Sequence, residues 1–405
     1  MIATKAPALE WPGRTNEEWH RSKLARFALD TRATRPAAKA VGSRVPAPET
    51  LQADAQWAGQ LRFVDGALTG VVLDPALKAA GVQLGLLTQA PASVTKFLTI
   101  AEALCDTQAS LHHYQNLEFG AVLVLPPKVV ADKPFLIHLT ETRKEVLSVP
   151  HFAIHAGSLS QASLVIRSDS PAGTAFTTHT ATTVQLDDGA HFRLCDLQNH
   201  NLSAAVLDHS FARLGRDAQL FHWQACLGGG VVKSRFEFSL DGEGANLKTH
   251  GLYFGTSDQH KDLRIATTHR APHTTSYALY KGAVRDRSRT IFQGLIEVAP
   301  TAPGTDAYLS NKNLILNDGA RADSLPQLKI DTNDVKCSHG STTGKVNEDE
   351  VFYLMARGFS RDEARLIISE GLFAELIDEA PEALRGELER VVEDSLRSPA
   401  SGGAR

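Results

Sequence analysis

Residues 188–197, DGAHFRLCDL, set a Gly-Ala turn directly before a run in which apolar and polar side chains alternate. A turn-and-strand unit of this kind recurs along the chain. Its other copies are residues 160–169 (SQASLVIRSD), 216–225 (RDAQLFHWQA), 243–252 (EGANLKTHGL), 281–292 (KGAVRDRSRTIF) and 318–328 (DGARADSLPQL). Their alanines, Ala162, Ala190, Ala218, Ala245, Ala283 and Ala320, are separated by 28, 28, 27, 38 and 37 residues. Such a repeat indicates a solenoid, in which each unit buries its apolar face by stacking on the next.

The strands of this repeat are short and rich in Val, Leu, Phe and Thr, as in residues 120–130 (GAVLVLPPKVV) and 135–141 (FLIHLTE). Gly and Asp in the turns tolerate the backbone conformation that a tight corner needs. No long helical pattern separates the units. We therefore predict a mainly β protein with a right-handed parallel β-helix as its core and helical N- and C-terminal regions. An immunoglobulin-like sandwich is the structural alternative.

Three regions are expected: a helical N-terminal region (1–110), the β-helix core (111–345) and a C-terminal helical region (346–405). In the first, Thr15 and Glu18 have the spacing of a capping box, and residues 93–105 form a second helical stretch. Between them, residues 33–56 are rich in Ala and Pro without an apolar period, which indicates a linker.

The C-terminal region reads as consecutive capped helices. Asn347 can cap the first, Gly358 can end it, and Ser360 forms a capping box with Glu363. Apolar stripes follow at Ala364, Ile367, Ile368 and Leu372, and at Leu384, Leu388, Val391 and Val392. Residues 346–405 carry 14 acidic and 7 basic side chains, against 32 and 35 in the rest of the chain. This acidic bias suits either a solvated helical face or a docking surface for a basic partner.

The overall composition narrows the function classes. A net charge of -4 gives no basic footprint for nucleic acid, and no run approaches the 18 apolar residues that span a membrane. The first residues, MIATKAPALEWPG, lack an export pattern, so a cytoplasmic location is expected. Cys105, Cys195, Cys226 and Cys337 are far apart, so no Cys-x-x-Cys motif exists to hold zinc or a whole iron-sulfur cluster.

Cys337 and His339 are the strongest candidate pair for chemistry. In a strand, residues two apart point to the same side, so both side chains would project together. A thiolate and an imidazole suit iron or zinc, but two ligands are too few for a stable site. A Cys-His nucleophilic dyad is a second interpretation, and a structural cysteine beside a polar histidine is the third.

Two other groups of polar residues are weaker candidates. His260, Asp262, His269 and His273 lie close in sequence, but their surroundings predict strands and turns rather than a metal-binding helix. The adjacent Asp187 and Asp188 suggest the paired carboxylates of a β-helical polysaccharide-active enzyme, although neighbours in a strand face opposite ways.

Two long segments carry a family resemblance. They are residues 251–298 (GLYFGTSDQHKDLRIATTHRAPHTTSYALYKGAVRDRSRTIFQGLIEV) and 326–371 (PQLKIDTNDVKCSHGSTTGKVNEDEVFYLMARGFSRDEARLIISEG). The chain resembles the SufB/SufD family of iron-sulfur cluster assembly proteins, and residues 12–22 (PGRTNEEWHRS) are similar to the opening of its SufD branch. The resemblance implies a β-helical core with helical ends, in agreement with the repeat.

The resemblance also implies partners and a role. It implies a non-catalytic subunit that pairs with a SufB-like paralogue, binds a SufC-like ATPase through its C-terminal helices and supports assembly of a nascent cluster. It further implies that removing residues 346–396 abolishes ATPase binding without unfolding the solenoid. No cofactor is expected to bind stably to this chain alone, and a flavin requirement stays open. A homodimeric scaffold and the polysaccharide-active enzyme are the alternatives.

Single positions favour the SufD branch. By resemblance, SufB carries a cysteine at about the place of Asn311 and a glutamate at the place of Gly340. The KCSHG segment matches the SufD pattern. His339 is therefore the main candidate to contribute to a shared cluster-assembly interface, and Cys337 is the secondary candidate ligand.

Overall fold

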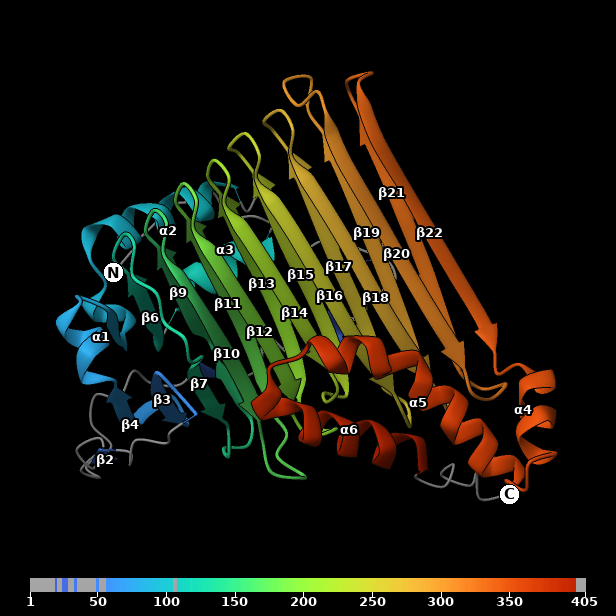
Figure 1. The fold of residues 1–405 in the computed structure, drawn as a ribbon. Coiled ribbons are helices and arrows are strands. Elements are labelled where there is room, and N and C mark those ends of the chain that lie inside the picture. The colour runs from blue at the N-terminus through green and yellow to red at the C-terminus, as the bar shows by residue number, and fades with distance from the viewer. Residues whose placement is uncertain are drawn as a thin grey trace.

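The computed structural model describes Trp19 and residues 24–27, 33–34, 49–50, 56–104, 108–117 and 119–397. Over these residues the chain winds into a β-solenoid of about eight turns, and each turn gives one strand to each of two facing sheets (Figure 1). Neighbouring strands of the solenoid run parallel and lie two apart in chain order. An immunoglobulin-like sandwich, which has antiparallel sheets, is therefore wrong, and the predicted parallel solenoid is confirmed.

The two sheets take alternate strands. Sheet A contains β5 (Gln83–Leu86), β6 (Phe119–Leu125), β9 (Pro150–Ala156), β11 (Thr177–Leu186), β13 (Ala205–Leu214), β15 (Val231–Leu240), β17 (His260–His269), β19 (Arg289–Val298) and β21 (Arg321–Ile330), with β8 (Val146–Ser148) beside β11 and β1 (Ala33–Thr34) beside β8. Sheet B contains β2 (Glu49–Thr50), β4 (Ala67–Leu73), β3 (Gly59–Val64), β7 (Phe135–Thr140), β10 (Gln161–Asp169), β12 (His191–Asn199), β14 (Gln219–Cys226), β16 (Asn246–Gly255), β18 (Thr275–Val284), β20 (Thr305–Ile315) and β22 (Val335–Lys345).

The repeat is more regular than the alanine series suggested. Strands of sheet B pair at steps of 27 to 31 residues through to the last turn, so the period does not lengthen to 37 or 38. Ala190, Ala218 and Ala245 occupy one buried corner position. Thr274 and Thr305 take that position in the next two turns, where each hydroxyl donates to the carbonyl three residues earlier. Ala162, Ala283 and Ala320 therefore lie outside the series.

The core lies between the two sheets. Because parallel neighbours pair in register, alternate residues of successive strands form rows that point inward. Phe192, Leu220 and Leu247 form one such row in sheet B, and Phe236, Ile265 and Phe292 belong to the same core from sheet A. Burying each large apolar side chain contributes about 1.5–3 kcal/mol. The stacked turns therefore stabilise one another.

The N-terminal region contains more strand than predicted. β3 and β4 form an antiparallel hairpin, and β5 pairs antiparallel with β6. Asp65 and Gly66 join the hairpin with positive φ angles of 53° and 77°, as a two-residue hairpin turn requires. The predicted helix ending near Cys105 is confirmed as α2 (Ala92–Leu104). The capping box at Thr15 and most of the 33–56 linker lie outside the described residues.

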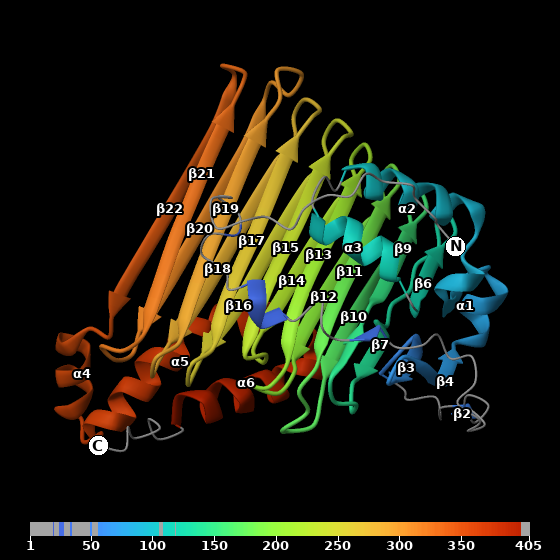
Figure 2. The same cartoon turned by 180° about the vertical axis from the view of Figure 1, so that it is seen from behind.

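Short helices of the N-terminal half cover sheet A and, in the case of α1, lie at the N-terminal end of the solenoid. They are η1 (Leu24–Phe27), α1 (Pro75–Ala79), η2 (Leu87–Gln89), α2 and α3 (Gln108–Asn116). Figure 2 shows α2 and α3 on the outer side of this sheet. Val94 and Leu98 of α2 pack against Val122 and Ala153 of the strands below.

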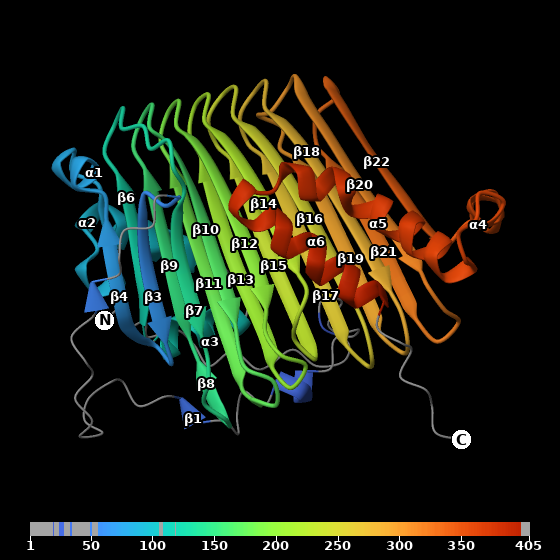
Figure 3. The ribbon, with the colours of Figure 1, turned by 60° about the horizontal axis from the view of Figure 1, so that its bottom comes forward.

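Helices α4 (Glu348–Met355), α5 (Arg361–Glu379) and α6 (Glu382–Arg397) follow the last strand. The predicted caps are confirmed: Asn347 accepts from the Asp349 amide, Ser360 and Glu363 form a capping box, and Gly358 has a φ of 97°. Figure 3 shows α5 and α6 lying across the outer face of sheet B. Leu384, Leu388 and Val392 of α6 are buried there as predicted, whereas Ile367 of α5 is exposed.

The C-terminal helices α5 and α6 are packed on the solenoid and form part of its folded structure. Phe373, Leu376 and Leu388 pack with Trp223 and Leu252 of sheet B, and the Trp223 ring N–H donates to the Leu376 carbonyl at 2.9 Å. Each such residue contributes about 1.5–3 kcal/mol by burial. Removing residues 346–396 would uncover this apolar face, so we now expect the deletion to destabilise the solenoid as well as to affect partner binding.

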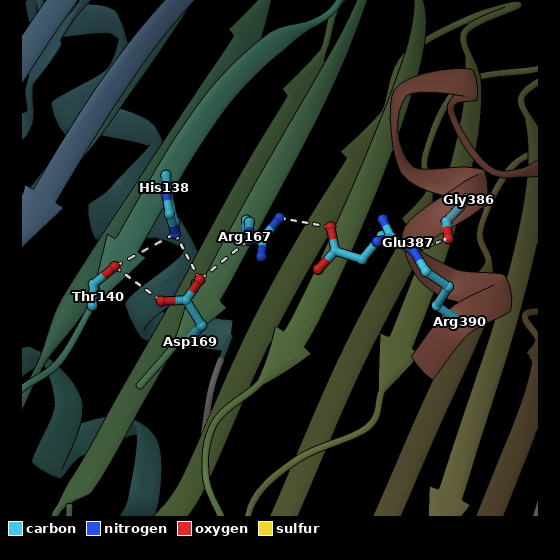
Figure 4. A network of polar contacts seen from close by, with 7 residues as sticks. All are labelled: His138, Thr140, Arg167, Asp169, Gly386, Glu387 and Arg390. Atoms are coloured by element: carbon cyan, nitrogen blue, oxygen red, sulfur yellow. Dashed lines mark hydrogen bonds and ion pairs between the residues drawn. The ribbon is translucent and has the colours of Figure 1, made fainter. Parts of the chain in front are cut away.

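Part of the acidic bias is matched within the molecule. Glu387 of α6 accepts a hydrogen bond from Arg167 of β10 at 2.7 Å, and Arg167 also contacts Asp169 (Figure 4). On α5, Lys248 and Lys281 of sheet B donate to Glu379 and Glu375 at 2.6 Å each. The outer face of sheet B is thus a basic partner of the acidic helices.

Candidate functional site

The last turn of the solenoid is its open end. β21 and β22 stand at the ends of their sheets, and among the described residues no further strand pairs with either (Figure 1). β22 pairs with β20 in register, so Ala307 lies beside Cys337 and Leu309 beside His339. Both partners in β20 are buried in the core. Cys337 and His339 therefore face the space between the two sheets, as the prediction of a shared face required.

Each residue of the pair ends an inward-facing row. Cys337 ends the row that begins with Phe192, Leu220 and Leu247 and passes through Ser276 and Ala307, and it is half-buried against the core. Burial, followed by the nearby charge of Asp306, raises the pKa of the Cys337 thiol. The neutral thiol is therefore the form favoured in the isolated chain, which disfavours a nucleophilic Cys-His dyad.

His339 ends the neighbouring row and is exposed. Four turns earlier in the same row, His222 is fully buried, with its Nδ1 3.0 Å from the Thr249 hydroxyl. His339 differs because, in the part of the chain that the structure describes, no further solenoid turn covers it. Its imidazole is therefore accessible at the open end.

Apolar side chains surround the pair at this end. Leu328 and Ile330 of β21 are each 37% exposed, although Ile296 and Val298, their register partners one turn earlier, are 2% and 0% exposed. The two last strands meet where the Ser341 hydroxyl lies 2.8 Å from that of Ser324. Uncovered core positions beside unpaired strand edges favour pairing with another chain.

Asn311 and Gly340 have distinct structural roles. Asn311 is fully buried, donates to the Tyr253 hydroxyl at 2.9 Å and accepts from the Asn313 amide at 2.7 Å. Its side chain is thus committed to the interior network. A Cβ at Gly340 would lie 3.1 Å from the Tyr308 hydroxyl, so a larger residue there requires Tyr308 to shift.

The second histidine group does not converge. His260 and Asp262 project from the outer face of sheet A, where Asp262 contacts Lys233 and Arg264. His269 points inward, with its two ring nitrogens within 2.9 Å of the Thr274 and Ser276 hydroxyls. His273 lies in a turn with a φ of 53°. Within the described ranges, no three His, Cys, Asp or Glu side chains gather as a metal site.

Asp187 and Asp188 line an open polar depression at one corner of the solenoid. A hydrogen bond from His155 lowers the pKa of Asp187, whereas a glycosidase general acid needs a raised one. Asp188 accepts from the Arg216 amide, and Arg213 pairs with Asp241. These contacts form a ladder of charges between successive corners and do not support polysaccharide chemistry.

An apolar patch on and beside α4 was missed by the sequence analysis. Phe352 is 73% exposed, and Tyr353, Met355, Phe359 and Ile367 are also exposed. Only Val351 of α4 is buried, against Ala364. The signal was available in the EDEVFYLM segment, where apolar residues exceed what one buried face can hold.

Residues 138–372 match the family model described as "SUF system FeS cluster assembly, SufBD core domain". This span covers more than half of the chain and includes the end of β7 and all of β8 to β22, with Cys337 and His339. The chain belongs to the SufBD family. The predicted family is thus confirmed.

Similar SufBD proteins include SufD. The chain is 34% identical to the iron-sulfur cluster assembly protein SufD of Escherichia coli over 224 residues, or 55% of this chain and 52% of that protein. It is 38% identical to a SufBD family protein of Mycobacterium leprae over 174 residues (41% and 44%). For one of Mycobacterium tuberculosis the identity is 32% over 253 residues (60% and 63%). The matches thus span about half of these relatives, and the chain is SufD-like.

The helices of this SufBD chain give no sign of a membrane span. None within the described part is both long and apolar enough to cross a bilayer.

Proposed function

We propose that this SufBD chain is a SufD-like, non-catalytic scaffold subunit whose open end pairs with a SufB-like paralogue to form an interface for iron-sulfur cluster assembly. The observation that carries the proposal is the uncovered last turn, where Leu328 and Ile330 are exposed at positions that are buried one turn earlier. A second solenoid placed end to end would restore both their burial and the missing strand pairing. The chain would act in the cytoplasm.

His339 is the proposed contribution of this chain to the interface. A neutral imidazole binds iron, and His339 is exposed on the face that the second subunit would cover. Cys337 lies on the same face but keeps a neutral thiol, so it would need to lose its proton to act as a ligand. Two ligand types are too few for a cluster, and the partner would supply the others. The cluster is cargo rather than a resident cofactor.

The α4 patch is the proposed docking surface for a SufC-like ATPase. Aromatic and methionine side chains are enriched in the buried centres of protein interfaces, and Phe352, Tyr353 and Met355 present such a set. The inner faces of α5 and α6 are occupied by sheet B, which leaves α4 and the outer side of α5 for a partner.

The cluster role is tested by His339→Ala in cells that depend on this chain. The variant should fold and pair normally, because the side chain is exposed, yet activity of iron-sulfur enzymes should fall to the level of a deletion strain. His191→Ala, another exposed histidine of sheet B, is the matched control and should retain full activity. Normal enzyme activity in His339→Ala cells would remove the proposed role.

The docking role is tested by Phe352→Asp, with co-purification of a SufC-like ATPase as the measurement. A buried charge at an interface centre costs several kcal/mol, so the ATPase should be lost from the complex. Leu202→Asp, which changes an exposed leucine at a solenoid turn, should keep the ATPase in the complex. Retention of the ATPase by Phe352→Asp would place the docking surface elsewhere.

A homodimer through the same open end is the second candidate, because its exposed strand edges suit any chain of the same fold. Light scattering of the chain alone and with a SufB-like paralogue separates the two. A homodimer that persists after the SufB-like paralogue is added would favour the homodimeric scaffold.

A further inference from the structure

A cavity of about 680 Å³ lies between the outer face of sheet B and the connection from α5 to α6. Strands β12 and β14 form its floor, and Pro381 at the start of α6 forms part of its wall. This volume is in the range of small-molecule sites. The cavity is separate from the open end and from the α4 patch.

Two arginines converge on the cavity from different elements. Arg193 of β12 donates to the Glu379 carbonyl at 3.1 Å, and Arg385 of α6 donates through Nε to the Ala380 carbonyl at 3.0 Å. A guanidinium group has five N–H donors, so each keeps donors for another partner. Glu382 also lines the cavity, which leaves one net positive charge among these three side chains.

The two like charges affect each other. Burial is the main cause that lowers the pKa of Arg193; Glu379 opposes this shift, and the charge of Arg385 adds to it. A negative group between the two guanidinium groups would relieve this repulsion, and planar guanidinium groups bind phosphate and carboxylate well.

The rest of the wall is aromatic and apolar. The Arg193 guanidinium lies 4.5 Å and the Lys248 ammonium 5.3 Å from the ring centre of Phe221. Trp223 is 1% exposed and donates its ring N–H to Leu376, so it contributes only to the base of the cavity. Cys195 is buried, and burial raises the pKa of its thiol well above the ordinary value, so it acts as an apolar wall. Positive charge and apolar surface adjoin in this cavity, which suits an amphipathic ligand.

We propose that this cavity binds a small organic anion, namely a flat aromatic ring carrying a phosphate or carboxylate group. The ring lies along the apolar wall at Phe221 and Pro381, and the anionic group lies between Arg193 and Arg385. The ligand would join β12 to α6 and so hold the C-terminal helices on the solenoid. This assignment is independent of the cluster interface.

Three probes with one ring test the proposal by titration calorimetry on the full chain: 1-naphthyl phosphate, 1-naphthoate and uncharged 1-naphthol. Both anions should bind at one site and raise Tm, with 1-naphthol at least tenfold weaker. The tighter of the two anions identifies the head group. Equal binding of 1-naphthol, or binding at several sites, would overturn the proposal.

Charge-removing variants locate the site. Arg193→Gln and Arg385→Gln should each weaken anion binding at least tenfold, while Arg216→Gln, at an exposed corner of the solenoid, should not change it. If Arg193→Gln fails to fold, Arg385→Gln decides alone, because its side chain is exposed on α6. Unchanged binding in Arg385→Gln would refute the assignment.

Discussion

At the N-terminal end of the solenoid the chain reverses direction, whereas at the C-terminal end the last two strands stay parallel to their predecessors. β3 and β4 form an antiparallel hairpin and β5 pairs antiparallel with β6, and here Leu61 and Phe63 are fully buried. At the other end Leu328 and Ile330 are exposed. A chain that closes one end with reversed strands and leaves the other uncovered favours one-sided, end-to-end pairing.

The largest effect expected from this difference is on stability. Leu61→Ala should destabilise the chain by about 3 kcal/mol, because it leaves a cavity in a closed core. Leu328→Ala should cost less than about 1 kcal/mol, because its side chain is already partly in water. Urea unfolding of the two variants compares the same substitution at both ends.

Equal losses in the two variants would contradict the assignment of an open end. A sharper form of the test repeats the measurement with the paired subunit present. The loss of stability caused by Leu328→Ala should then be larger than in the unpaired chain, since pairing would bury the side chain.

The helices on the two sheets are also attached differently. α3 is attached to sheet A through imidazoles: His113 Nε2 lies 3.0 Å from His151 Nδ1, and His112 Nδ1 lies 3.1 Å from His179 Nδ1. Figure 4 shows α6 attached to sheet B through the ion pair of Arg167 and Glu387. Burial lowers the pKa of His151 to about 3, and burial with the neighbouring histidine charges lowers those of His113 and His179.

Mild acid should therefore loosen α3 before α6. A histidine whose pKa is lowered in the docked state stabilises docking above its ordinary pKa of about 6.5, and this stability is lost as the pH falls below that value. At pH 6.0 the loss is about 0.8 kcal/mol for each histidine, or roughly 2.5 kcal/mol for His113, His151 and His179 together. Hydrogen exchange of residues 108–117 at pH 7.5 and 6.0 measures this loss of stability as a loss of amide protection.

The amides of α6 should keep their protection over the same pH range. Although burial opposes it, hydrogen bonds from His138, Thr140 and Arg167 keep the pKa of Asp169 well below its ordinary value, so this network stays charged. His113→Gln should reduce the pH dependence in α3. Equal loss of protection in both helices at pH 6.0 would show that the imidazole contacts do not determine the pH dependence of α3 attachment.

The sequence predicted the solenoid but not its phase or its closed end. The corner alanines gave the period correctly from Ala190 to Ala245, and the later turns were missed because Thr274 and Thr305 fill the same position with a hydrogen-bonded hydroxyl. The β3–β4 hairpin had a local signal, since Asp65-Gly66 is a strong two-residue turn. That signal was overlooked in a region interpreted as helical.

The site depends on contacts that no local pattern contains. The shared face of Cys337 and His339 follows from strand geometry and was predicted, because residues two apart point the same way. The position of β22 at an open end depends on where the stack of turns stops. Likewise, the acidic residues of α5 and α6 meet Arg167, Lys248 and Lys281, which are scattered over different strands. A composition count can reveal the acidic bias but not its partner.

Pairing at the open end should respond strongly to charge. Leu328→Asp places a carboxylate where a second solenoid would exclude water, so association with the SufB-like paralogue should weaken at least tenfold, or about 1.4 kcal/mol. Leu202→Asp is the control, because it adds the same charge at an exposed turn. Sedimentation of mixtures measures the association. Unchanged association of Leu328→Asp would place the pairing surface elsewhere.

The smallest expected effect concerns the thiol at the open end. Burial and the charge of Asp306 raise the pKa of Cys337, so Asp306→Asn should lower it and speed alkylation by iodoacetamide at pH 8, though by less than about threefold, because a half-exposed charge acts weakly. Asp331→Asn, in the turn before β22, is the control. Mass spectrometry of the Cys337 peptide gives the rate. In the paired complex the reaction should nearly stop, and a rate that pairing leaves unchanged would mean that the second subunit does not cover this turn.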